Sequence, residues 1–484
     1  MSIVWRLRVG NLPKYMEPKG LKKILVKMDI EEAKVKKAPK WNYGFLTFKS
    51  KATLEDAQKK LDGFKVRDNT LSIENCNTTE DAHRFRFDNR AAQVREKIPI
   101  DARAAAEKLA EQVTPYYKMP YDRQLSKKTT DMAKILSDFR NKMKKMPNKQ
   151  ETRLKVETAK MWLAWSLDNS LSLPFKTLDT IPSPNTEGYR TKCEFTIGFD
   201  LDGNRTVGFL LGLYKDGVTA VLEPQECVHV GDAAKKVATA MQNYVRSSDL
   251  EPYDRTTKQG YWRSLLVRTQ RCGEIMIIVQ FHPQDLTEER ITEEKARIKA
   301  FWEAMRTASE GAVDTTTLLV QMYNGIANGF QEHIPMELMF GPGYVHEDML
   351  GCRFRISPTA FFQVNTPGAE MLYSMCRDWC NIDPTKSTTL LDLCCGTGTI
   401  GITMANSVGK VIGVEMVEQS VADARENAKN NGLNNAEYIC SKVEEVLHVL
   451  NQFDSLTDSV VAVLDPPRYA SSFLLLHFYV DCSD

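Results

Sequence analysis

Three short stretches near the end of the chain carry residues whose types and spacing could do chemistry. "LLDLCCGTGTI", residues 390–400, passes from an apolar run into a glycine-rich turn, and "VIGVEMV", residues 411–417, places Glu415 at the end of a second apolar run. "VAVLDPPR", residues 461–468, ends a third run on Asp465. Glycines let a backbone turn tightly beside a ligand, and carboxylates accept hydrogen bonds from hydroxyl groups. The three stretches therefore predict one ligand site.

The spacing of these residues fits an open α/β sheet. Glu415 follows Gly396 by 415 − 396 = 19 positions, which is where such a fold places a ribose-binding carboxylate. A helix is expected from about Ile400, and Asp465 should lie at the carboxyl end of a strand, where ligands bind in these sheets. The glycine pattern is DxxCGxG and not GxGxxG, but an enzyme that uses a nicotinamide cofactor remains the competing interpretation.

The same stretches resemble motif I and the motifs that follow it in class I S-adenosylmethionine-dependent methyltransferases. Three further stretches narrow the resemblance to the RNA uracil-C5 methyltransferases, over roughly residues 185–468: "YRTKCEF" at 189–195, "ELMFGPGYVHEDMLG" at 337–351 and "SPTAFFQVNTPGAEMLY" at 357–373. The resemblance implies S-adenosyl-L-methionine as the cofactor, tRNA as the partner and C5 of uridine as the methylated position.

The family resemblance also implies roles for four residues. Gln363 should contact the methionine end of the cofactor, Gly396 and Glu415 should bind its nucleoside part, and Asp465 should lie near the methyl donor and the target base. In the family chemistry a Cys thiolate adds to C6 of uracil and a carboxylate base removes the C5 proton. The base must leave its stack to be reached. An RNA N-methyltransferase is a weaker alternative, because DPP motifs also bind amines.

The residues after the DPPR tetrapeptide depart from the family. In relatives the nucleophile and the base follow DPPR, whereas here the following stretch is "YASSFLLLHFYVDCSD". Its one cysteine, Cys482, follows a connection (residues 468–477) that is shorter than the dozen or so residues of a crossover helix. We therefore expect a truncated or alternatively spliced chain that lacks both catalytic groups, with an incomplete methyltransferase domain at 346–484. The alternative is a catalytically inactive RNA-binding isoform.

The first 78 residues read as strand, helix, strand, strand, helix, strand. "LRVGNL" at 7–12 and "WNYGFLTF" at 41–48 resemble the two signature strands of an RNA-recognition motif. Alternation along the second strand places Tyr43 and Phe45 on one sheet face, where two rings can stack on bases. Arg8 stands where the family usually has a third aromatic ring. The same fold could instead serve protein contacts.

Two segments separate this motif from the methyltransferase domain. Residues 79–160 are predicted to form a basic helical linker, and residues 161–345 a central module of mixed α+β structure that binds RNA. Arg190 and Lys192 lie two apart and should share one face of a strand, where they would suit a phosphate backbone. An ordinary exposed strand edge is the alternative. The predicted fold class is thus multidomain, with a ferredoxin-like RNA-recognition motif, an α+β module and a Rossmann-like domain.

Charge and cysteine content limit the partners and the compartment. Residues 1–160 hold 37 Lys and Arg against 21 Asp and Glu, so the remaining 324 residues carry 64 − 37 = 27 against 63 − 21 = 42. A net charge of +16 on residues 1–160, against −15 on residues 161–484, favours a polyanionic partner for the first segment. The 11 cysteines show no disulfide framework and indicate a reducing compartment, cytoplasm or nucleus. Cys376 and Cys380 alone make a poor metal site, and neither a metal nor a membrane partner is expected.

Overall fold

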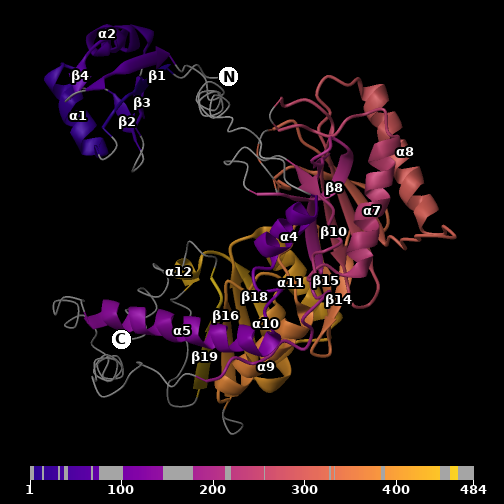
Figure 1. Ribbon diagram of the computed structural model, residues 1–484. Coiled ribbons are helices and arrows are strands. Elements are labelled where there is room, and N and C mark those ends of the chain that lie inside the picture. The colour runs from indigo at the N-terminus through magenta and orange to yellow at the C-terminus, as the bar shows by residue number, and fades with distance from the viewer. Residues whose placement is uncertain are drawn as a thin grey trace. The chain divides into compact units, whose positions relative to one another are not determined.

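The computed structural model divides the chain into two compact units, residues 1–99 and 100–484, each with its own core (Figure 1). The residues that it describes are 5–13, 16–30, 33–37, 42–48, 50–66, 69–75, 102–144, 178–212, 220–255, 257–325, 327, 329–331, 333–382, 387–446 and 458–466.

The N-terminal unit has the predicted order of strands and helices. Its sheet is antiparallel, with the strand order β2-β3-β1-β6. The elements are β1 (Trp5–Gly10), α1 (Pro18–Lys27), β2 (Lys34–Lys36), β3 (Gly44–Phe48), α2 (Lys51–Leu61), β4 (Lys65–Val66), β5 (Asn69–Thr70) and β6 (Ser72–Asn75). The ferredoxin-like fold that the sequence predicts is confirmed.

Strand alternation separates the two faces of this sheet. Leu7 and Val9 of β1 are buried in the core that the sheet forms with α1 and α2, and Leu46 of β3 joins them. Because successive side chains point to opposite faces, Arg8 lies on the other face. The Ser50 hydroxyl accepts a hydrogen bond from the Thr53 N–H at 3.3 Å and so caps α2. The sequence thus fixes which residues this unit presents for contact with a partner.

The segment predicted as a linker contributes two helices to the C-terminal unit, α4 (Ala102–Val113) and α5 (Tyr121–Lys144). Ala105 and Leu109 of α4 are buried in the core of the central module. Gln112 adds two hydrogen bonds, since its amide donates to the Leu210 carbonyl at 3.1 Å and accepts from the Gly212 N–H at 2.7 Å. At least this helix is therefore an integral part of the second unit and not a tether.

The central module is built on a seven-stranded sheet with the order β13-β12-β11-β10-β7-β8-β9. Only β11 and β12 pair in parallel among its described neighbours. The elements are β7 (Lys192–Phe199), β8 (Arg205–Leu210), β9 (Val221–Leu222), α7 (Asp232–Ser247), β10 (Trp262–Thr269), β11 (Ile275–Phe281), α8 (Glu288–Met305), β12 (Thr317–Met322) and β13 (Met336–Phe340). The mixed α+β prediction is confirmed.

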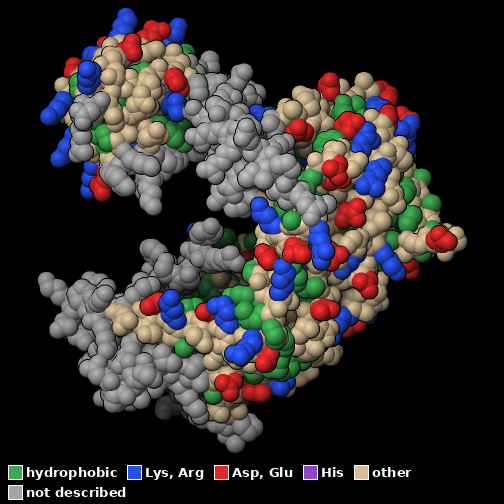
Figure 2. Space-filling model, in the orientation of Figure 1, with side chains coloured by type: hydrophobic (Ala, Val, Ile, Leu, Met, Phe, Trp, Pro, Cys, Tyr) green, Lys and Arg blue, Asp and Glu red, His purple; other side chains and the backbone are tan. Residues whose placement is uncertain are grey.

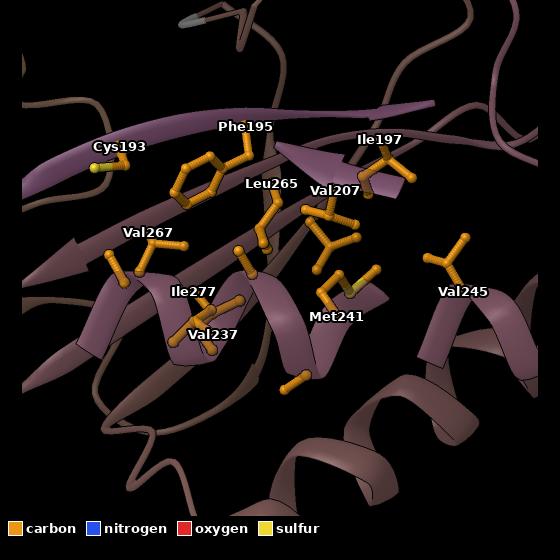
Figure 3. Close-up of a cluster of buried hydrophobic side chains, with 14 of the residues drawn as sticks. Cys193, Phe195, Ile197, Val207, Val237, Met241, Val245, Leu265, Val267 and Ile277 are labelled. Atoms are coloured by element: carbon orange, nitrogen blue, oxygen red, sulfur yellow. The ribbon is translucent and has the colours of Figure 1, made fainter. Parts of the chain in front are cut away.

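Helices α7 and α8 cover one face of this sheet (Figure 1). Figure 3 shows the side chains of Phe195, Leu265 and Ile277 directed at Val237 and Met241 of α7. The next residue along each strand points to the opposite face. Leu266 and Ile278 therefore belong to a second core, which includes residues of the methyltransferase domain. The central sheet is therefore buried between two layers.

The methyltransferase domain holds a parallel sheet with the order β18-β17-β16-β19. Its elements are the hairpin β14 (Val345–Met349) and β15 (Cys352–Ile356), α9 (Thr366–Trp379), β16 (Ser387–Leu393), α10 (Thr399–Met404), the 3-10 turn η3 (Ala405–Ser407), β17 (Lys410–Glu415), α11 (Glu418–Asn430), β18 (Ala436–Cys440), α12 (Val443–Val446) and β19 (Asp458–Leu464). This order is the Rossmann-like arrangement that the sequence predicts. Among the helices described, none offers an apolar stretch of membrane-spanning length.

Two amides, one on α11 and one at its C-terminal cap, close the edge of β15. The Asn427 side chain accepts a hydrogen bond from the Arg355 N–H at 2.7 Å and donates to the Arg355 carbonyl at 3.3 Å. One turn later Asn431 makes the same pair of bonds with Arg353, both at 2.9 Å. Asn427 also donates to the Thr397 carbonyl in the glycine-rich turn at 3.3 Å. These side chains thus act as a substitute strand and tie the hairpin to the turn.

The Asn427→Ala variant should lower the free energy of unfolding by about 2–3 kcal/mol, because it removes the partner of the half-buried backbone groups of Arg355 and of the buried Thr397 carbonyl. Asn430→Ala, an exposed asparagine on the same helix, is the matched control and should change stability by less than about 0.5 kcal/mol. Chemical denaturation of both variants provides the measurement. Equal losses in the two variants would contradict the role assigned to the Asn427 amide.

Candidate functional site

The glycine-rich turn after β16 is held in a left-handed backbone conformation. Cys394, Gly396 and Gly398 have φ values of 62°, 55° and 78°. A Cβ built on Gly396 would meet no atom within 4 Å, so the turn leaves open space on this side. A Cβ on Gly398 would lie 2.8 Å from the Tyr438 hydroxyl oxygen. One glycine therefore faces a free volume, and the other admits an aromatic ring from β18.

The helix after the turn begins within one residue of the predicted position and is short. Helix α10 begins at Thr399 and spans six residues before it tightens into the 3-10 turn at Ala405. So short a helix contributes little dipole. The N–H groups and the open space of the turn are thus what this part of the site offers a ligand.

Glu415 lies at the end of β17 and reaches the turn, as its spacing predicts. Its Oε2 accepts a hydrogen bond from the Gly396 N–H at 3.0 Å, and its Oε1 accepts from the N–H groups of Met416 at 2.8 Å and Val417 at 2.9 Å. A carboxylate has about four lone-pair sites. Since three are used, an acceptor site remains on Oε2 for a ligand hydroxyl. The open side of Gly396 and this free acceptor fit the ribose of a nucleoside cofactor.

Asp465 follows the last residue of β19 and is exposed. Its N–H donates to the Leu393 carbonyl at 3.4 Å, so the end of β19 lies directly beside the start of the turn. Because β16 pairs in parallel with β17 on one side and with β19 on the other, the strand order reverses at this point. Ligands bind at such switch points. The structure therefore brings Asp465, Gly396 and Glu415 to one edge of the sheet.

Gln363 reaches the same edge from the loop before α9. Burial raises the pKa of Tyr373, whereas hydrogen bonds with Thr399 and Gln363 oppose that rise, and the charges of Asp392 and Asp465 add to it. The Tyr373 hydroxyl lies 3.4 Å from that of Thr399 at the start of α10. Gln363 therefore lies within hydrogen-bonding reach of Tyr373, whose hydroxyl is beside the start of α10.

Asp392 is a site residue that sequence reasoning missed. It is fully buried one residue before the end of β16, and its Oδ2 accepts a hydrogen bond from the Gly401 N–H at 2.8 Å. Burial raises its pKa to about 7, the Gly401 N–H opposes this, and the charges of Asp465 and Glu415 add to the rise. The signal was present as the first letter of the DxxCGxG pattern. Asp392 connects the strand to the helix and so shapes the turn.

Arg190 and Lys192 do not share a strand face as predicted. Strand β7 begins at Lys192, and Arg190 lies before it, in an isolated bridge with Val230. The Arg190 guanidinium lies close enough to lower the pKa values of Cys193 and His229, while the Lys192 ammonium pairs with Glu194 at 3.0 Å. Burial is the larger cause at both groups: it raises the pKa of Cys193 and lowers that of His229. The two cations therefore have different partners, and their contact with RNA stays a prediction.

The predicted RNA-binding residues of the N-terminal unit form one cluster on its sheet. The Arg8 guanidinium lies 4.9 Å from the centroid of the Tyr43 ring and pairs with Glu74 at 2.8 Å. The Tyr43 and Phe45 rings meet edge to face at 5.7 Å. Phe45 keeps only 6% of its surface exposed, whereas Tyr43 is half-buried. Tyr43 is therefore the more accessible ring, and stacking by Phe45 stays a prediction. Lys and Arg side chains lie around the rim of this unit (Figure 2).

The remaining residues that the sequence analysis named are Cys482 and the pair Cys376 and Cys380. Cys482 and the rest of residues 467–484 fall outside what the structure describes. Cys376 is a free thiol on α9, and Cys380 is a free thiol at the C-terminal cap of that helix. Among the described residues no three His, Cys, Asp or Glu side chains come together as metal ligands.

Comparison with known proteins places the chain in a family. A methyltransferase-domain model matches residues 384–474, and an RNA-recognition-motif model matches residues 7–72. The human tRNA (uracil-5-)-methyltransferase homolog A is 35% identical over 474 residues, which cover 96% of this chain and 71% of that protein. The chain belongs to the tRNA (uracil-5-)-methyltransferase family. The human homolog B is also 35% identical, over 371 residues that cover 76% of this chain and 70% of that protein.

Solved structures of lower similarity also match this tRNA (uracil-5-)-methyltransferase family member. The tRNA (uracil-54, C5)-methyltransferase of Pyrococcus abyssi, in complex with S-adenosyl-L-homocysteine, is 18% identical, with a TM-score of 0.44 over 60% of this chain and 62% of that chain. The family resemblance stated for the sequence is thereby confirmed by the closer sequence relatives, while the roles of the individual site residues stay predictions.

The raised pKa of Asp392 predicts a pH-dependent stability. The folded state holds a proton on this carboxyl up to about pH 7, whereas an unfolded aspartate loses it near pH 4. The folded state thus binds more protons between these values, and the free energy of unfolding falls as pH rises through this window. Asp392→Asn can still accept from the Gly401 N–H and should lack this fall. We expect a difference between the two proteins of about 1 kcal/mol or more, since a tenfold change in a proton-binding constant is worth about 1.4 kcal/mol. Chemical denaturation of both proteins at pH 5 and pH 8 measures this difference. An equal change in the free energy of unfolding between the two pH values in both proteins would refute the prediction.

A second prediction concerns the ring of Tyr43. Tyr43→Ala should weaken binding of a single-stranded oligoribonucleotide by about fivefold to a hundredfold, the usual range for loss of one base–aromatic stack. Tyr43→Phe keeps the ring and should bind like the original protein. Fluorescence anisotropy with the full chain measures both. Equal losses would assign the contact to the hydroxyl group, and no loss in Tyr43→Ala would remove this ring from the RNA interface.

Proposed function

We propose that this protein transfers a methyl group from S-adenosyl-L-methionine to C5 of uridine in tRNA. The observation that carries the proposal is the convergence of four predicted residues at one edge of the methyltransferase sheet. The Gly396 N–H donates to the Glu415 carboxylate at 3.0 Å. Asp465 follows β19, which pairs with β16, the strand that leads into the turn. Gln363 contacts Tyr373 beside the same turn. Membership of the tRNA (uracil-5-)-methyltransferase family supports the choice of reaction.

The residues of this site would divide the work of binding. The cofactor, when bound, supplies an electrophilic methyl group. The free acceptor on Glu415 suits a ribose hydroxyl, the open side of Gly396 accommodates the nucleoside, and the Gln363 amide suits the methionine end. Asp465, exposed at the switch point, would lie near the methyl donor and the target base.

The acceptor half of the reaction needs two groups that are not assigned among the described residues. A Cys thiolate would add to C6 of the uracil, which makes C5 nucleophilic, and a carboxylate would remove the C5 proton after transfer, with release of the thiolate. The target base would have to leave its stack. The sheet face of the N-terminal unit is suited to bind single-stranded nucleotides of the same RNA.

Methylation of an unmodified tRNA with radiolabelled S-adenosyl-L-methionine tests the proposal. Transfer would yield 5-methyluridine on nuclease digestion and a covalent complex with RNA that contains 5-fluorouridine, and it would overturn the expectation from the sequence that this chain lacks the nucleophile and the base. Label on a ring nitrogen would indicate an N-methyltransferase instead. Binding of both RNA and cofactor without transfer would favour the non-catalytic RNA-binding role.

The contribution of Glu415 can be measured separately by calorimetry. Glu415→Ala should weaken S-adenosylhomocysteine binding by about tenfold or more, because it removes the ribose acceptor and frees the turn at Gly396. Glu418→Ala, three residues further on and exposed at the start of α11, is the matched control and should bind as tightly as the original protein. Unchanged affinity in Glu415→Ala would exclude this carboxylate from the cofactor site.

A further inference from the structure

A buried arginine of the central module reaches the loop that carries Gln363. Arg268 lies on β10 and is 1% exposed. Figure 3 shows Val267, its neighbour, directed at α7, so Arg268 points to the opposite face, toward the methyltransferase domain. Its Nη2 donates to the Ala360 carbonyl and, at 3.4 Å, to the Pro358 carbonyl. A single side chain therefore joins the central sheet to the start of the loop.

The burial of this guanidinium needs an explanation. Burial lowers the pKa of Arg268 to about 10, and the Glu194 carboxylate on the adjacent strand partly offsets this. The side chain thus remains charged at neutral pH, although its Nε has no hydrogen-bond partner in the part of the chain that the structure describes. A buried charge is costly unless its position requires it. An apolar residue would fill this layer beside Leu266 at lower cost, so the two carbonyl contacts are the feature that sets Arg268 apart.

A second anchor from the central module lies on the other side of Gln363. The Thr191 N–H donates to the Val364 carbonyl at 2.8 Å, and its hydroxyl donates to the same oxygen at 3.2 Å. Between the anchors, Phe362 is buried, while the preceding ring of Phe361 is 69% exposed. The backbone on both sides of Gln363 is therefore fixed by residues at least 90 positions away in the chain.

We propose that Arg268 is a positioning residue, which sets from the central module the conformation of the loop that presents Gln363 to the cofactor. The inference rests on the proposed function for the identity of the ligand. It adds that the methyltransferase domain does not form its cofactor site alone. Loss of the Arg268 anchor should free Pro358 and Ala360, and the Gln363 amide would then lose its fixed approach to the methionine end.

Arg263 provides a matched control. It lies five positions earlier on the same strand, is 5% exposed, and also donates to the carbonyls of a loop, those of Tyr323 at 3.3 Å, Ala327 at 2.8 Å and Gly325. Replacement of either arginine by Met removes a buried guanidinium that holds a loop. Only the loop held by Arg268 contains Gln363, so only its loss should change the affinity for the cofactor.

The test is calorimetric titration of the full-length variants with S-adenosylhomocysteine, without RNA. Arg268→Met should raise the dissociation constant about tenfold, and Arg268→Lys should recover part of the lost affinity. Arg263→Met should keep the dissociation constant within about twofold of that of the unsubstituted protein, even where its melting temperature falls as much as that of Arg268→Met. In turnover, Arg268→Met should raise the KM for S-adenosylmethionine more than it lowers kcat. Equal affinities of Arg268→Met and the original protein, or equal losses in Arg268→Met and Arg263→Met, would overturn the inference.

A second variant covers a failure of Arg268→Met to fold. Thr191→Val removes only the hydroxyl contact to Val364 and keeps the N–H contact, so it should fold and weaken binding by about twofold to fivefold. No change in that variant would count against a loop positioned from the central module. Absence of binding by the original protein would instead contradict the proposed cofactor, and so the two failures are distinguishable.

Discussion

The parallel pairing of β16 with β17 and β19 is the constraint on which the candidate site depends. Because both neighbours run in the same direction as β16, their carboxyl ends meet at one edge, and three residues far apart in the sequence become neighbours there. The register is tight: Leu393 lies opposite Val414 on one side and Leu464 on the other. A shift of one residue in either pairing would turn Glu415 or the end of β19 away from the turn. The buried apolar strands that enforce this register therefore also fix the chemistry.

A second constraint acts through the central sheet, which has two buried faces. One face packs on α7 and α8, and the other shares a core with the β14–β15 hairpin and the methyltransferase domain. Polar contacts follow the same boundary. Arg271, in the turn between β10 and β11, pairs with the buried Glu347 at 3.5 Å and with Glu370 of α9 at 2.8 Å. The turn of one module thus lies against the hairpin and helix of the other, so movement of either would disturb the loop that precedes α9.

The sequence predicts the features that depend on local pattern. Strand ends, glycine turns and alternation are sufficient to place Glu415 beside Gly396 and to order the elements of both terminal domains. Features that depend on distant packing are not predictable in this way. The docking of α4 requires knowledge of the central core, and the direction of Arg190 depends on where β7 begins. The contacts of Arg268 join segments about 90 residues apart, which no local spacing reveals.

The electrostatics of the sheet edge connect its structure to its proposed chemistry. Three carboxyl groups, those of Asp392, Glu415 and Asp465, gather there. Burial raises the pKa of Asp392, and the charges of the other two add to the rise. Asp392 serves as an acceptor for the Gly401 N–H and holds its proton over part of the neutral range, whereas Glu415 and Asp465 give the edge its negative potential. A sulfonium cofactor carries a positive charge that this potential would attract, and the charge disappears once the methyl group has left. The same carboxylates would therefore favour the donor over its product, so that binding and release follow from one arrangement of charge.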